Sequence, residues 1–134
     1  MPWLVRFANG SIGRARIALA YEQDAWLRRL EPMFDDLARG RADLDELGPL
    51  MSKFAGDFAE QWVKDHKNAS KEAANNQAVR AMLGMIGTIC RDRMARLAAD
   101  APADDPDTAE AMLHPWLRVT ELIVLAERQL QHNV

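Results

Sequence analysis

The chain has 134 residues, of which 49% are hydrophobic and 28% charged, and its net charge at pH 7 is −3. This length predicts one domain that can bury a modest core, and the single cysteine, Cys90, excludes an intrachain disulfide. The acidic balance excludes a chain-wide attraction to nucleic acid or anionic membranes, while a local basic patch stays compatible with it.

The sequence shows neither a charged-then-apolar leader nor an apolar run of the roughly 18 residues that span a bilayer. Together with the lone thiol, this pattern favours a cytoplasmic protein. The residues around Cys90 read as helix, so we expect its thiol to be buried and structural rather than reactive.

The sequence predicts an all-α fold. Good helix formers dominate, and no stretch alternates with period two between turn signals. A short helix is expected over Pro2–Ala8, ended by Gly10, and a second over 12–22, capped by Ser11.

A third helix is capped by Asp24 and ends at Gly40, and its apolar residues recur at helical spacing: Trp26, Leu27, Leu30, Phe34 and Leu37. Pro32 is expected to kink or split this helix. Asp43 caps a fourth segment, which Gly48–Pro49 is expected to divide into a short and a longer helix.

The polar stretch 64–76 predicts a loop near Asn68–Ser70, and a fifth helix follows over 72–99. Gly84 and Gly87 within it each cost on the order of 1 kcal/mol of helix stability relative to Ala. This cost predicts a close approach of another backbone at the two glycines.

An acidic, proline-bearing loop over 100–107 leads to a last helix over 108–132. The natural break in the chain lies near Arg39–Arg41. It predicts a small N-terminal helical piece, 1–40, and a helical bundle, 41–134, a size usual for domains.

Catalytic and metal-binding patterns are missing from the sequence. His66, His114 and His132 are far apart, whereas zinc needs three or four convergent ligands. The carboxylates fall in caps and loops, and no nucleophile elbow or phosphate-binding loop is present. We therefore expect no metal, no cofactor bound by this chain alone and no independent catalytic site.

The arginine clusters lack the interleaved aromatic residues that stack bases, so they are interpreted as solvated helix faces: Arg28–Arg29, Arg39 with Arg41, and Arg91–Arg93–Arg96.

The most specific string is Asn-Gly-Ser-Ile-Gly-Arg-Ala-Arg, residues 9–16. Arg14 falls in the first turn of a helix capped by Ser11, and Gly13 lets another surface approach. Unpaired N–H groups and the positive end of a helix dipole suit a phosphate. A tight turn between helices explains the same residues equally well, and both interpretations stay open on physical grounds.

Residues Leu4–Ala20 resemble the lid segment of bacterial DNA polymerase III clamp-loader subunits. The resemblance implies that Arg14 is the sensor 2 residue, which reaches the terminal phosphate of ATP beside Ser11 and Gly13. Gln77–Leu97 is similar to the long collar helix of that family.

Glu121–Val134 resembles the helix that precedes the last collar helix. The resemblance implies the end of an ATPase lid followed by an antiparallel helical collar, with the ATPase core and the last collar helix absent. The length and acidic balance are closest to the delta-prime type of subunit, with a gamma/tau-type relative as the alternative.

The function implied is structural: the module packs against sister subunits in a five-membered ring that loads the sliding clamp in DNA replication. ATP and magnesium would be bound only by the parent assembly, and DNA and the clamp would be reached only through it.

A collar needs a second apolar surface besides its own core. The candidates on the fifth helix are Met82, Met85, Ile86 and Ile89, with filling of the core as an equal alternative. The absence of a last helix would expose a second set, Val119, Leu122, Ile123 and Leu130, and predicts a homodimer of the isolated chain.

Two other classes of function compete with this hypothesis. An unrelated helical adaptor would bind a peptide or partner helix in a groove, and the lack of an ATPase core upstream of Pro2 in the gene would favour it. A small helical enzyme or ligand binder would show a buried pocket with converging polar groups.

Overall fold

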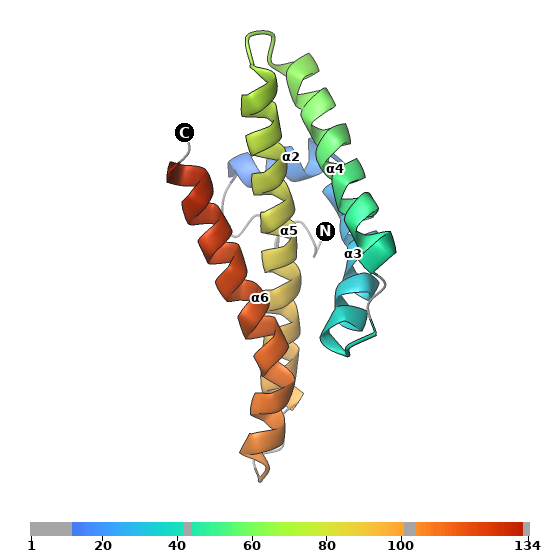
Figure 1. Cartoon of the computed structure of the whole chain (residues 1–134), viewed down its shortest axis with the longest axis vertical. Helices are drawn as coiled ribbons and strands as arrows, with labels where there is room; N and C mark the ends of the chain where they lie inside the picture. The colour runs from blue at the N-terminus through green and yellow to red at the C-terminus, as the bar shows by residue number, and fades with distance from the viewer. Residues whose placement is uncertain (1–11, 42–43, 101–103, 133–134) are drawn as a thin grey trace. The chain divides into compact units, whose positions relative to one another are not determined.

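The computed structural model describes residues 12–41, 44–100 and 104–132. Every regular element within these ranges is an α-helix, which confirms the predicted all-α class (Figure 1). The elements are α2 (Ile12–Ala20), α3 (Gln23–Ala38), α4 (Leu44–Asp65), α5 (Lys71–Asp100) and α6 (Pro106–His132). The helix expected over Pro2–Ala8 and the caps Ser11 and Asp43 lie outside the described residues.

The chain forms two compact units, Met1–Met85 and Ile86–Val134, and α5 runs through the boundary between them. The residues of the expected break, Arg39–Arg41, follow the end of α3, and the predicted domains 1–40 and 41–134 stay a prediction. Each unit is therefore described separately.

The helix α3 ends at Ala38, two residues before the predicted end at Gly40, and Gly40 forms the turn that follows it. Gly40 has a positive φ of 71°, and its N–H donates to the Leu37 carbonyl at 3.1 Å while the Arg41 N–H donates to the Asp36 carbonyl at 2.7 Å. This pair of bonds satisfies carbonyls that the helix leaves unpaired, and the left-handed conformation it needs is cheapest for glycine.

The helices continue through their prolines. Pro32 lies inside α3 and Pro49 inside α4, so the predicted division of the fourth segment at Gly48–Pro49 is wrong. At Pro32, where a kink or a split was predicted, the helix is not split. Proline deprives the carbonyl four residues earlier of its donor. Arg28 and Asp45, at those positions, are exposed, so water can satisfy their carbonyls.

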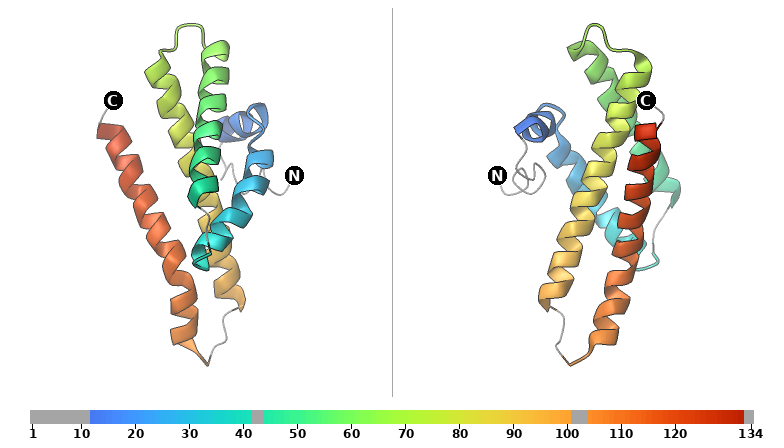
Figure 2. Two further views of the ribbon diagram at one scale, coloured as in Figure 1. Left: turned by 45° about the vertical axis from the view of Figure 1, so that its right-hand side comes forward. Right: turned by 90° about the vertical axis from the view of Figure 1, so that its left-hand side faces the viewer.

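The core of the first unit comes from residues at helical spacing on α3, α4 and the first half of α5. The buried apolar ones are Leu27, Leu30, Phe34, Leu47, Phe54, Phe58, Ala59, Ala74, Ala78, Leu83 and Met85. The first half of α5 runs antiparallel to α4, and the views agree in showing the two side by side (Figures 1 and 2).

A short turn over 66–70 joins α4 to α5, where the sequence predicted a loop. Ser70 caps α5, because its Oγ accepts from the Ala73 N–H at 3.0 Å. The predicted loop at this position is confirmed.

In the second unit, α6 runs back antiparallel to the C-terminal half of α5 (Figure 2). The buried residues of the second unit are Ile86, Thr88, Ile89, Cys90, Trp116 and Ile123. Burial raises the pKa of the Cys90 thiol, and hydrogen bonding to Thr120 opposes that rise. The thiol is fully buried, as expected from the sequence.

The helix α6 begins two residues before its predicted start, because Asp105 caps it. The Thr108 N–H and hydroxyl donate to the Asp105 carboxylate at 3.3 and 2.6 Å, and Pro106 occupies the first helical position, where its missing N–H costs nothing. These bonds from Thr108 lower the pKa of Asp105.

Candidate interaction surfaces

The lid-like string is only partly described. Gly13 and Arg14 lie in the first turn of α2, where Gly13 is exposed. Ser11 and the side chain of Arg14 lie outside what the structure describes. The phosphate-binding hypothesis for these residues therefore stays a prediction.

The candidate interface residues on α5 are mostly buried. Met85, Ile86 and Ile89 are 0, 6 and 1% exposed, and Met82 is half-buried. Apolar residues are spread around α5 rather than along one face, the pattern of a helix covered on several sides. The burial favours the core interpretation of these four residues over the interface interpretation.

The predicted close approach of a backbone at Gly87 is wrong. Among the residues that the structure describes, a Cβ added at Gly87 would meet nothing within 4 Å. The glycine therefore leaves unused space beside α5, and its cost to the helix has no packing explanation at that position.

The candidate residues on α6 separate into buried and exposed ones. Ile123 is 8% exposed and Leu122 is 60% exposed, while Val119 is half-buried; the side chain of Leu130 lies outside the described part. The expected exposure of Ile123 is wrong, because it lies seven residues after the buried Trp116 and shares its inward face.

Exposed apolar side chains lie on both sides of the buried seam of α6 and opposite it. Leu117 and Val124 are seven residues apart and share one flank, Leu122 lies on the other flank, and Leu125 points away from the seam. Their exposed fractions are 47, 41, 60 and 53%. We call these four residues the α6 flanks. A helix needs only one apolar stripe to pack, so the flanks exceed what the described packing of α6 uses.

Aromatic rings form a continuous stack along α4. Phe54, Phe58, Trp62 and His66 recur every fourth residue, and successive ring centroids are 5.9, 5.9 and 4.1 Å apart. Tyr21, which follows α2, stacks on Phe58 at 4.2 Å. Offset and stacked rings contribute about 0.5–1.5 kcal/mol per pair beyond their buried area. The stack therefore holds the end of α2 against α4.

A groove of about 370 Å³ opens beside this stack, and it lies wholly within the first unit. The described residues that line it are Ala20, Tyr21, Glu22, Trp26, Phe54, Asp57, Phe58 and Gln61. The sequence did not predict this groove, although the regular spacing of aromatic residues along α4 indicated the wall that Phe54 and Phe58 form. Tyr21, Glu22 and Trp26 join it only through the fold.

The Tyr21 hydroxyl is held by Asp65. It donates to Asp65 Oδ2 at 3.2 Å, and the Gln61 Nε2 donates to Oδ1 at 3.0 Å. Burial, followed by the hydrogen bond and the charge of Asp65, raises the pKa of Tyr21 to about 12. The phenol is therefore protonated at neutral pH and does not act as a base.

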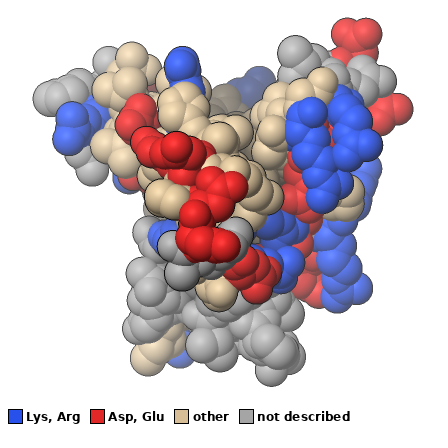
Figure 3. All heavy atoms as spheres, turned by 90° about the horizontal axis from the view of Figure 1, so that it is seen from below, with Lys and Arg blue, Asp and Glu red and all other residues tan. Residues whose placement is uncertain are grey.

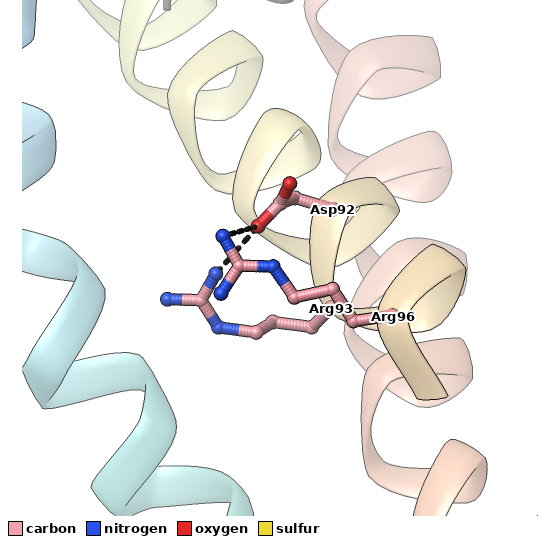
Figure 4. Close-up of polar contacts among 3 residues, drawn as sticks. All are labelled: Asp92, Arg93 and Arg96. Atoms are coloured by element: carbon pink, nitrogen blue, oxygen red, sulfur yellow. Dashed lines mark hydrogen bonds and ion pairs between the residues drawn. The ribbon is translucent and has the colours of Figure 1, made fainter. Parts of the chain in front are cut away.

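Two arginines of the α5 cluster form ion pairs with Asp92. Arg93 Nη1 and Arg96 Nη2 lie 2.6 and 3.1 Å from Asp92 Oδ2 (Figure 4). The side chain of Arg93 is only 13% exposed and that of Arg96 is 62% exposed. The predicted solvated face therefore applies to Arg96 and not to Arg93.

The view from below shows both a group of acidic side chains and a group of basic side chains (Figure 3). Around the start of α6 the exposed acidic residues are Asp100, Asp104, Asp105, Asp107 and Glu110. Asp105 acts there as a helix cap, which is a structural role. Over the described ranges, no group of three His, Cys, Asp or Glu residues could hold a metal ion, and no helix is long and apolar enough to cross a membrane.

Comparisons of the chain with protein-family models, with curated proteins and with solved structures gave no match. Function is therefore inferred from the N-terminal string and from the surfaces described above. The α6 flanks and the aromatic groove are the two surfaces that the core of the described chain does not explain.

Proposed function

We propose that the chain is a structural module of a bacterial DNA polymerase III clamp-loader subunit, closest to the delta-prime type, which helps to hold the loader ring together in the cytoplasm. The resemblance of Leu4–Ala20 to the lid segment supports the choice of assembly. The α6 flanks are the observation that carries the interaction role, since a module packed between sister subunits needs an apolar surface outside its own core.

Burial of the α6 flanks in an interface would contribute a few kcal/mol of favourable free energy. Full burial of an exposed Val or Leu side chain yields about 1.5–3 kcal/mol, and each flank residue is about half covered already, so each offers ~1 kcal/mol. Four such residues do not cover the cost of association alone. They would form the centre of a larger interface with a sister subunit.

ATP and magnesium belong to the parent assembly in this proposal. Arg14 would contact the terminal phosphate only together with an ATPase core, beside Ser11 and Gly13. DNA and the sliding clamp would be reached through the assembled ring.

Co-purification with the other clamp-loader subunits of the same genome tests the proposal. The wild-type chain is expected to co-elute with at least one of them, and Leu122→Asp/Leu125→Asp is expected to abolish co-elution, because it places charge in an apolar contact. Val63→Asp is the control, since Val63 is 42% exposed on α4, a helix of the first unit, whereas the flanks belong to the second unit.

Circular dichroism of both variants shows whether the helices persist. If the wild-type chain binds none of the loader subunits, the clamp-loader assignment fails. If Val63→Asp loses the complex as completely as the double variant, the α6 flanks are not the interface. An unrelated helical adaptor, the alternative function, would give the first of these results.

A further inference from the structure

The polar groups on the described lining of the groove are mainly acceptors. Glu22 and Asp57 bring two exposed carboxylates. The Gln61 amide donates one N–H to Asp65 and keeps a second N–H and a carbonyl oxygen that accepts. The Tyr21 hydroxyl donates its proton to Asp65. Apart from the indole N–H of Trp26 and the second amide N–H of Gln61, the side chains on this lining are acceptors, so the groove favours an occupant that donates hydrogen bonds.

The negative charge of the lining favours a cation, which can also donate hydrogen bonds. The described lining residues include two carboxylates and neither lysine nor arginine. Asp57 pairs with Lys53 at 3.2 Å, but both side chains are more than half exposed, and such pairs stabilise little. An incoming cation can therefore replace Lys53 at low cost.

The aromatic wall adds a preference for a flat cation. The groove is walled by Tyr21 and Trp26 with the buried Phe54 and Phe58 behind them. The ring of Trp26 already accepts a guanidinium: the Arg29 Cζ lies 4.7 Å from the ring centroid, although Arg29 does not line the groove. Guanidinium is planar, stacks on aromatic faces and offers five donors to carboxylates and carbonyls.

We propose that this groove is a docking site for an arginine side chain of a partner polypeptide. The guanidinium lies between the Glu22 and Asp57 carboxylates and against the Tyr21 and Trp26 rings. A volume of about 370 Å³ falls at the small end of ligand pockets, which matches one long side chain rather than a large cofactor. The site is on the first unit, separate from the α6 flanks, and the inference does not depend on the clamp-loader proposal.

Amide chemical shifts of the ¹⁵N-labelled full chain test the inference, with acetyl-Gly-Arg-Gly-amide as the probe. Saturable shifts are expected at the groove residues, with the largest at Tyr21, Glu22, Trp26, Asp57 and Gln61. The same peptide with citrulline in place of arginine keeps the shape and loses the charge, and we expect no saturable shifts with it. A lysine peptide is expected to bind more weakly, because it lacks the planar fork.

Charge-removing variants locate the contact. Asp57→Asn and Glu22→Gln are each expected to weaken arginine-peptide binding roughly threefold, the effect of one exposed charge contact. Glu60→Gln is the matched control, because Glu60 is exposed on the same helix and does not line the groove.

The absence of shifts with the arginine peptide overturns the proposal, as does equal binding of the citrulline or lysine peptide. Equal loss in Glu60→Gln and Asp57→Asn would also overturn it, since attraction would then come from the general acidity of the chain. Unchanged shift dispersion in each variant establishes that it is folded.

Discussion

Gln23 is the residue whose surroundings fit its chemistry least. It is the first residue of α3 and only 1% exposed, and within the described chain neither its Nε2 nor its Oε1 has a hydrogen-bond partner. An unsatisfied buried polar group costs about 1–3 kcal/mol. This cost exceeds what most single surface contacts contribute to stability.

Replacing Gln23 with Met is therefore expected to stabilise the chain by ~1 kcal/mol, since Met has a similar volume and no amide to desolvate. Urea unfolding followed by circular dichroism measures the change. Gln61→Met is the control, because the Gln61 amide is exposed and bonded to Asp65, and it should give no gain. Destabilisation by Gln23→Met would mean that the amide is satisfied in solution, for example by a buried water.

Glu22, directly before Gln23, shows a second local conflict. Its φ of 52° makes it the one non-glycine residue with positive φ among those described. A side chain in this region costs roughly 1 kcal/mol relative to glycine. The contacts of Tyr21 with Phe58 and Asp65 hold the turn in place, so tertiary packing overrides the local preference.

At the level of the helices, the ends follow local rules more closely than the interiors do. Ser70 and Asp105 cap α5 and α6, and Gly40 ends α3. Each of these features involves neighbours within a few residues, although the sequence pattern predicts only the role of Gly40. The continuity of α3 and α4 through Pro32 and Pro49 depends instead on which carbonyls face water, and this depends on the fold.

Two glycine substitutions separate backbone conformation from packing. A Cβ at Gly40 or at Gly56 would meet nothing within 4 Å, but only Gly40 has a positive φ. Gly40→Ala is expected to destabilise by about 1 kcal/mol through strain, whereas Gly56→Ala, inside α4, is expected to stabilise by up to about 1 kcal/mol through helix propensity. Thermal unfolding of the pair tests both signs, and equal effects would refute the assigned C-cap.

At the scale of the whole chain, the α6 flanks would form the apolar centre of a larger self-association interface of the isolated protein. Apolar residues on both sides of a helix can meet their own copies across a twofold axis. We expect the purified chain to be a dimer at high micromolar concentration, in sedimentation velocity, and Leu122→Asp/Leu125→Asp to be a monomer. A wild-type chain that sediments as a monomer at that concentration would contradict the prediction, and Val63→Asp serves again as the control.

The sequence by itself determined the all-α class, the positions of α3 to α6 within a few residues, the turn before α5 and the buried state of Cys90. These features depend on helical spacing, capping and glycine conformation, which act between residues close in the chain. It also supplied the lid-like string, on which the proposed assembly depends.

Only the tertiary structure decided which apolar residues remain exposed outside the core. Ile123 and Leu122 are neighbours in the sequence, yet one is buried and the other exposed, because their side chains point 100° apart around α6. The aromatic groove likewise joins Tyr21 and Trp26 to a distant part of the chain on α4. Burial and side-chain convergence are properties of packed surfaces, and a one-dimensional pattern does not specify which surfaces meet.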